Sequence, residues 1–162
     1  MLEKVLSDQE AKVIQVGVIV KDLSKTINFL SQLGLGPFKT VSATHPAAIV
    51  RGTKTAYSVL TAGVQLGAVQ LELIEYQSGT TVQKEFLDNK GEGIHHILFK
   101  VEDIDASIQR FAAQGVEVLQ QDRFVGGGGM AYMGTDSIGG IVFELVQYPK
   151  EYDAKTTLEY LS

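Results

Sequence analysis

The stretch VIQVGVIVKDLSKTINFLSQLG, residues 13–34, recurs as IHHILFKVEDIDASIQRFAAQG at residues 94–115. The two stretches align without a gap at a constant offset of 81 residues. Each begins with a run rich in aliphatic residues, continues into a helical pattern and ends in glycine. A duplicated unit folds twice into the same shape, and its equivalent positions become related by a pseudo-two-fold axis. The repeat therefore predicts two copies of one module in a single chain.

A second repeated stretch extends each module. AVQLELIEY at residues 68–76 aligns with GIVFELVQY at residues 140–148 at an offset of 72. The two alignments make Gln15 equivalent to His96, and Glu72 equivalent to Glu144. Repeated core positions would be apolar, whereas these four are polar and all can bind a metal ion. Symmetry-related strands would bring the four side chains to one point, so the pattern predicts a metal site shared by the two modules.

The length and amino-acid composition of the chain exclude several classes of function. The 162 residues, 17.6 kDa, suit a single domain that is long enough to bury a core. A net charge of −5 argues against nucleic acid as a partner, since no basic stripe neutralises phosphates. The absence of cysteine excludes disulfides, thiol nucleophiles and Cys-ligated zinc. No apolar run is long enough for a membrane span, and the N-terminal residues lack the apolar segment of a signal peptide, so we expect a cytoplasmic protein.

Each module reads as a strand, a helix and three further strands. In module one, residues 13–78, a helix follows the first strand, with Asp22 or Ser24 as its N-cap and Gly34 as its C-terminal stop. Module two, residues 93–148, repeats this design with Asp103 as the N-cap. The remaining strands are predicted near 38–43, 56–61 and 68–76 in module one, and near 116–123, 130–135 and 140–147 in module two.

The segments outside the modules are more polar. Residues 79–92 carry a short amphipathic patch at Val82, Phe86 and Leu87, which predicts a helical linker. Residues 149–162 form a polar C-terminal tail, which either packs as a short helix through Leu158 and Leu161 or frays. The whole chain is thus expected to form a single domain.

Strand alternation assigns the candidate residues to faces of the sheet. Gln15 is the one polar residue of the first strand and lies opposite the aliphatic face that a helix would cover. His96 shares the face of Gln15, whereas His95 is predicted on the helix-covered face. Taken alone, His96 suits a hydrogen-bonded core histidine, and a mid-strand glutamate suits an exposed strand face. Because Glu72 and Glu144 recur at equivalent positions, we favour a metal ion, which would offset the desolvation of both carboxylates.

The motifs QVGVIVKDL, VQLELIEY, GEGIHHILFKVEDI and GGGGMAYMGTDSIGGIVFELVQ cover most of residues 13–148. On these motifs the chain resembles the vicinal oxygen chelate superfamily, which includes glyoxalase I, methylmalonyl-CoA epimerase, extradiol dioxygenases, and the fosfomycin and bleomycin resistance proteins. The resemblance implies an α+β fold in which two tandem βαβββ modules form an open, U-shaped, eight-stranded mixed sheet. It also implies one metal ion on the concave face, bound by the first and last strands of each module at Gln15, Glu72, His96 and Glu144.

The four predicted ligands limit which metal ions and which reactions the site suits. One imidazole, one amide and two carboxylates suit an octahedral divalent ion such as Zn, Ni, Co, Mn or Mg, whereas iron dioxygenases need two histidines and one carboxylate. By analogy with glyoxalase I, we expect a metal-dependent isomerase or lyase that moves a proton at the carbon next to a carbonyl or thioester. Glu144 is the first choice for the catalytic base, and Glu72 is its alternative.

The resemblance leaves the substrate open. Glyoxalase I binds glutathione through an arginine and an asparagine, and the matching positions here are Ile19 and Tyr76. Methylmalonyl-CoA epimerases use an additional glutamate in module one, but no Asp or Glu occurs between Leu23 and Leu71. The alternative function is non-catalytic binding of a small molecule in the same cleft, as in the antibiotic-resistance members of the superfamily.

Three basic residues, Lys39, Arg51 and Lys54, lie in this stretch without acidic residues. They are interpreted either as a solvated rim or as substrate-binding residues that attract an anionic group such as a carboxylate or a CoA phosphate. We also expect a homodimer, both from the resemblance and because open sheets leave edges that a second copy would cover.

Overall fold

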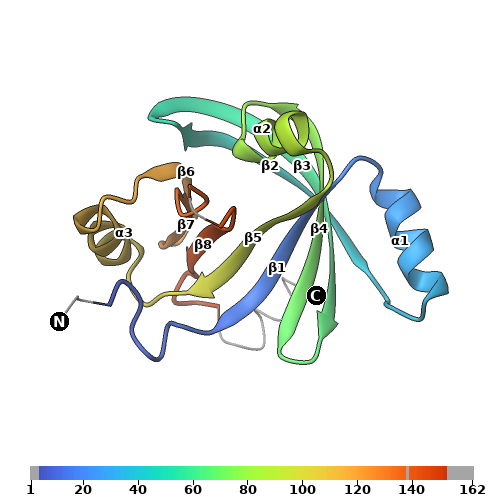
Figure 1. Cartoon of the computed structure of the whole chain (residues 1–162), viewed down its shortest axis with the longest axis horizontal. Coiled ribbons are helices and arrows are strands. Elements are labelled where there is room, and N and C mark those ends of the chain that lie inside the picture. Colours follow the sequence, from blue (N-terminus) through green and yellow to red (C-terminus); the bar gives the residue numbers. More distant parts are fainter. Residues whose placement is uncertain (1–3, 138, 153–162) are drawn as a thin grey trace.

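The computed structural model describes residues 4–137 and 139–152, in which it places eight strands and three helices (Figure 1). The order of elements confirms the predicted repeat and the helical linker. Module one consists of β1 (Val13–Val20), α1 (Leu23–Gln32), β2 (Lys39–Val50), β3 (Thr53–Leu66) and β4 (Val69–Gly79), and is followed by α2 (Val82–Lys90). Module two consists of β5 (Gly93–Lys100), α3 (Ile104–Ala113), β6 (Val118–Arg123), β7 (Gly129–Met133) and β8 (Val142–Gln147).

The two modules have the same internal pairing. In each, the first strand pairs in parallel with the last, as β1 with β4 and β5 with β8. The last three strands of each module form an antiparallel meander. The modules join where β1 runs antiparallel to β5. The architecture is therefore α+β, with an eight-stranded mixed sheet built from two βαβββ units.

The sheet is closed into a barrel in the order β1-β4-β3-β2-β6-β7-β8-β5, so the expectation of an open U-shape was wrong. Closure depends on β2 and β3, which extend well beyond the residues predicted for them. The end of β2 reaches β6, where Ile49 pairs with Gln121 and Val50 with Gln120. The backbone N–H of Arg51 then donates to the carbonyl of Leu119 at 2.8 Å. The longer hairpin thus supplies the backbone groups that join the two modules a second time.

Helices α1 and α3 lie outside the barrel, one beside each module (Figure 1). Each begins at a predicted N-cap, because the Asp22 carboxylate accepts from the Lys25 N–H and the Asp103 carboxylate from the Ala106 N–H. Leu23 of α1 is buried against Val20, Ala62 and Leu73 on the outer face of module one. Phe111 of α3 has the matching role in module two. It packs with Phe99, Ala131, Met133 and Leu145.

Helix α2 lies over one end of the barrel (Figure 1). Its first residue, Val82, packs in a cluster with Leu98, Tyr132 and Val142. One turn later, Phe86 packs against a second cluster that contains Ile19. The linker between the modules therefore contributes side chains to the core and covers the space around which the candidate site residues lie.

None of the helices in residues 4–137 and 139–152 is long and apolar enough to cross a membrane. The predicted tail helix through Leu158 and Leu161 lies outside the described residues.

Candidate metal centre

The four predicted ligand residues come from four adjacent strands. Gln15 lies on β1, Glu72 on β4, His96 on β5 and Glu144 on β8, and the barrel order places these strands as β4-β1-β5-β8. Gly17 of β1 is the register partner of both Glu72 and His96. A methyl group at Gly17 would overlap the imidazole of His96, so the absence of a side chain there is what admits the ring.

The atom His96 Nε2 lies at the centre of this group. It is 2.9 Å from Glu144 Oε2, 3.5 Å from Gln15 Oε1 and 4.0 Å from Glu72 Oε2. Two donors that each bind an octahedral ion at about 2.1 Å lie about 3.0 Å apart when adjacent and about 4.2 Å apart when opposite. The separation of 2.9 Å is close to the first of these values and that of 4.0 Å to the second, whereas 3.5 Å lies between them. The structure thus brings all four predicted residues together.

Burial sets the electrostatics of the site. Gln15, His96 and Glu144 are buried, whereas the side chain of Glu72 is 21% exposed, so solvent reaches the group at β4. Burial raises the pKa of Glu72 to about 7, with the charge of Glu144 adding to the rise and that of His96 opposing it. Burial lowers the pKa of His96, but its contact and hydrogen bond with Glu144 and the charge of Glu72 outweigh this and raise the pKa.

The donor chemistry fits a divalent ion. An imidazole nitrogen, an amide oxygen and two carboxylates form a mixed nitrogen and oxygen set, and a cation would stabilise the buried carboxylates. No three His, Cys, Asp or Glu side chains in the described ranges are already arranged to hold a metal ion. His96 and Glu144 bond directly to each other, while Glu72 lies farther away. Closing the set around an ion therefore requires Glu72 to move toward His96.

Two further residues adjoin the site. The Nε2 group of Gln15 donates to Gln70 Oε1 at 2.6 Å. The ring of Tyr132 packs against that of His96 with 5.1 Å between centroids. Neither residue was predicted from the sequence. Alternation could have indicated Gln70, since it lies two residues before Glu72 on the same face of β4. No sequence signal indicated Tyr132, whose place follows from its register pairing with Glu144.

The position predicted for His95 was wrong. A bulge in β5 pairs Gly17 with His96 and then Val18 with Ile94, which leaves His95 as the extra residue. Two residues that oppose one no longer alternate between faces. His95 therefore lies beside His96, with 3.0 Å between their Nδ1 atoms, and its ring packs edge-on against Tyr132. Burial, with the charges of His96 and Lys90, lowers the pKa of His95 to about 3, so its ring is neutral near pH 7.

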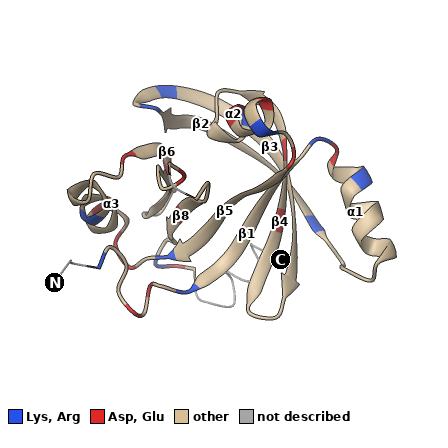
Figure 2. Ribbon diagram, viewed as in Figure 1, with Lys and Arg blue, Asp and Glu red and all other residues tan. Residues whose placement is uncertain are grey.

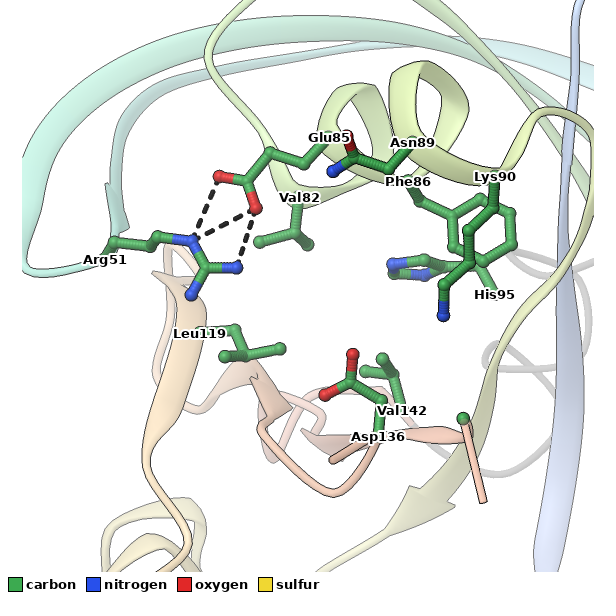
Figure 3. Close-up of a pocket in the computed structure, with 11 residues that line it drawn as sticks. Arg51, Val82, Glu85, Phe86, Asn89, Lys90, His95, Leu119, Asp136 and Val142 are labelled. Atoms are coloured by element: carbon green, nitrogen blue, oxygen red, sulfur yellow. Dashed lines mark hydrogen bonds and ion pairs between the residues drawn. The ribbon is translucent and has the colours of Figure 1, made fainter. Parts of the chain in front are cut away.

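Beside His95, a pocket of about 100 Å³ opens under α2 (Figure 3). Arg51 and Glu85 face each other at its edge, where the guanidinium donates to both carboxylate oxygens at 2.7–3.1 Å. Lys90 and Asp136 add one further charge of each sign. The lining is completed by Val82, Phe86, Asn89, Leu119, Gly140 and Val142.

A larger pocket, of about 500 Å³, lies near the start of β1 and the end of β8. Its lining includes Ile14, the neighbour of Gln15, and Tyr148, which follows β8. Three lysines line it, Lys12, Lys100 and Lys150. The lining also includes Glu10, which pairs with Arg110, and Glu102, so it combines charges of both signs with apolar groups, and its volume suits a small organic ligand.

The three predicted substrate-binding residues do not form one cluster. Basic segments mark both ends of the β2–β3 hairpin (Figure 2). Lys39 begins β2, whereas Arg51 and Lys54 lie at the turn between β2 and β3. Arg51 is engaged by Glu85. Lys39 is separated from Ala43 and His45 by an even number of residues, so it lies on the same side of β2 as these two, which pack inward against the cluster around Tyr57. Lys39 itself is exposed, at the start of the strand.

The family model described as the glyoxalase/bleomycin resistance protein/dioxygenase superfamily matches residues 14–133. The chain belongs to this superfamily, which confirms the resemblance seen in the repeated motifs. A curated relative in Bacillus subtilis strain 168, named "Uncharacterized protein YqjC", is 32% identical over 87 residues. That match covers 51% of this chain and 61% of YqjC, less than two thirds of the relative's length.

Solved structures share the fold. The hypothetical protein BH1468 from Bacillus halodurans C-125 superposes with a TM-score of 0.63 at 22% identity, covering 88% of this chain and 97% of the other. Methylmalonyl-CoA epimerase from Mycobacterium tuberculosis gives a TM-score of 0.59 at 24% identity, with coverage of 90% and 94%. A variant of the Streptomyces coelicolor epimerase in complex with 2-nitronate-propionyl-CoA gives 0.58 at 24% identity, with coverage of 86% and 95%. At these identities the likeness establishes the architecture.

Proposed function

We propose that the chain is a metal-dependent isomerase or lyase that moves a proton at the carbon next to a carbonyl or thioester. The observation that supports this most directly is the approach of three side-chain oxygens, from β1, β4 and β8, to His96 Nε2 at 2.9–4.0 Å. These strands come from both modules, so the donors meet only when the whole chain is folded. Membership of a superfamily that includes epimerases supports the same reaction class.

In this proposal, Gln15, His96 and Glu144 hold the ion, and Glu72 completes the set. A divalent ion bound there supplies Lewis-acid polarisation of a substrate carbonyl, which makes the adjacent C–H more acidic. Glu144 was the first choice for the base, but the geometry favours Glu72. The carboxylate of Glu144 is bonded to His96, whereas Glu72 is partly exposed and lies 4.0 Å from His96 Nε2, so it is the carboxylate less engaged by the other donors. A carboxylate that is held less firmly is freer to accept and return a proton.

The substrate is proposed to be a small organic anion. The larger pocket provides three lysines and apolar surface near Gln15, together with Glu10 and Glu102, and Lys39 lies at the exposed start of β2, on the side of the strand that faces inward farther along. The epimerases that share the fold act on methylmalonyl-CoA, as their names state, and this thioester has a free carboxylate. Methylmalonyl-CoA and adducts of 2-oxoaldehydes are therefore the first substrates to test.

The test has two stages. Elemental analysis of the purified chain is expected to find about one divalent ion per chain, and a His96→Ala variant is expected to lose it. The loaded protein is then assayed for loss of the α-proton from each candidate substrate by exchange in deuterated water. Tight binding of a small molecule without metal and without exchange would overturn the proposal in favour of a non-catalytic binding protein.

A further inference from the structure

Gln70 lies beside the candidate metal centre without being one of its donors. It is on β4, two residues before Glu72, and only 2% of its surface is exposed. Its Oε1 atom accepts the hydrogen bond from Gln15 Nε2 at 2.6 Å, whereas Gln15 Oε1 lies 3.5 Å from His96 Nε2. The two buried amides thus form a pair across β1 and β4, whose Gln15 and Gln70 are register partners.

This bond fixes which end of the Gln15 amide faces His96. A carboxamide has an oxygen that can bind a cation and an NH₂ group that cannot. With its NH₂ group held by Gln70, Gln15 presents Oε1 to the site, 3.5 Å from His96 Nε2. With Gln70 oriented as it is, rotation of the Gln15 amide alone by half a turn would place two oxygens, Gln15 Oε1 and Gln70 Oε1, against each other and would direct the NH₂ group at the site.

The other end of Gln70 argues against a role in stability alone. Within residues 4–137 and 139–152, the Nε2 atom of Gln70 is buried and has no hydrogen-bond partner. A buried donor without a partner is unfavourable for folding, and an apolar side chain of the same shape would avoid it. The feature that Gln70 provides and an isosteric methionine lacks is the acceptor for Gln15.

We propose that Gln70 is a positioning residue, which holds the Gln15 amide so that its oxygen, and not its nitrogen, is available to a divalent cation. The inference rests on the proposed metal site and adds to it a residue that does not touch the ion. Outer partners that orient a metal-binding side chain typically contribute about 10–100-fold to metal affinity.

The experiment compares metal affinities, measured by isothermal titration calorimetry with Zn²⁺ and with Mn²⁺ on the metal-free full chain. Gln70→Met keeps the shape of the side chain and removes the acceptor, and it is expected to weaken binding at least about 10-fold. Gln70→Glu restores an acceptor for Gln15 Nε2 and is expected to bind within a few-fold of the unsubstituted chain or more tightly.

Gln120→Met is the matched control. Gln120 is also fully buried and also has an unpartnered Nε2, but it accepts hydrogen bonds from Thr81 and from the backbone of Val82 at the start of α2. Its loss is expected to lower the melting temperature while leaving metal affinity within two-fold.

A double substitution distinguishes the positioning role from a purely structural one, because the two roles predict different changes in metal affinity. In a Gln15→Glu background both terminal atoms at position 15 are oxygens, so orientation no longer matters. Adding Gln70→Met to this background is expected to change metal affinity less than three-fold. An equal loss in both backgrounds would overturn the positioning role, as would a Gln70→Met chain that binds like the unsubstituted one. If the unsubstituted chain itself binds neither ion, the proposed function falls, and this inference falls with it.

Discussion

The imidazole of His96 occupies the space that a side chain at Gly17 would fill. Gly17 is the register partner of His96 on one side and of Glu72 on the other, so the ring and the carboxylate approach each other over a bare segment of β1. The equivalent of Gly17 in the second module is Leu98, which fills its share of the interior with an aliphatic side chain. The repeat is therefore asymmetric at the place where module one must make room for the histidine of module two.

A Gly17→Ala substitution is expected to displace the His96 ring. Forcing a methyl group into this space should destabilise the fold by about 1–3 kcal/mol and weaken metal binding, because the ring and the new methyl group cannot both be accommodated. Chemical denaturation and calorimetry measure the two effects. Gly134→Ala is the control, since its Cβ would lie 3.3 Å from flexible side-chain atoms of Glu117 and Leu119. Metal affinity that is unchanged in Gly17→Ala would contradict the proposed role of His96.

Substituting each glutamate separately distinguishes the base from the ligand. Glu72→Gln is expected to reduce turnover at least about 100-fold while retaining much of the metal, because an amide can bind an ion but cannot accept a proton. Glu144→Gln is expected to weaken metal binding more than Glu72→Gln does, since it removes the carboxylate that bonds to His96. Turnover and metal content are measured on the same samples. The reverse pattern, with turnover lost only in Glu144→Gln, would return the role of base to Glu144.

The metal-free protein is expected to lose stability as the pH rises above about 6.5. The folded-state pKa of Glu72 is raised from 4.5 to about 7 and that of His96 is also raised, whereas that of His95 is lowered from 6.5 to about 3. Below about pH 6.5 the proton that the folded chain keeps on Glu72 is offset by the one that it lacks on His95, so the folded chain holds more protons than the unfolded chain only above this pH. Melting temperatures between about pH 5 and pH 8 test this, and Glu72→Gln, which removes one of the two opposing groups, should make stability increase with pH below about 6.5. Stability of the unsubstituted chain that increases above about pH 6.5 would count against the pairing described here.

Metal binding is expected to have the opposite dependence. Glu72 must release its proton to bind an ion, so the affinity for Zn²⁺ should fall as the pH is lowered through about 7. Calorimetry in two buffers with different ionisation enthalpies would detect the released proton. In Glu72→Gln both the pH dependence and the proton release should diminish, whereas persistence of both would assign them to another group.

Charge reversal locates the anionic group of the substrate. Lys39→Glu is expected to raise KM several-fold with little change in kcat, because Lys39 lies on the side of β2 that faces inward farther along and the interaction would be equal in the ground and transition states. Lys54→Glu is expected to have a smaller effect, since Lys54 lies at the exposed turn beyond β2. The effect of Lys39→Glu should shrink at high salt, where the screening length falls from about 8 Å to about 3 Å. Equal and negligible effects would leave both lysines as a solvated rim.

The repeat made the module order and the four central residues predictable, because equivalent polar positions in duplicated strands have few explanations other than a shared site. Gln70 was missed for the same reason, since its equivalent in module two is the apolar Val142. His95 was misplaced because alternation assumes a regular strand, and one extra residue in β5 changes the face on which a side chain lies. Closure of the barrel depends on a few backbone hydrogen bonds between distant strands, and these leave no periodicity in the sequence.

Joining β2 to β6 also changes how copies of the chain can meet. Free strand edges present unpaired N–H and C=O groups, which invite another chain to extend the sheet, whereas a closed ring has none to offer along its paired strands. The expectation of a homodimer rested partly on such edges. The seam, however, covers only Ile49 and Val50 of β2. In the described part of the chain, the edge of β2 from Lys39 to Ala48 pairs with β3 on one side and with no strand on the other, so this is the edge along which a second copy can continue the sheet without opening the barrel.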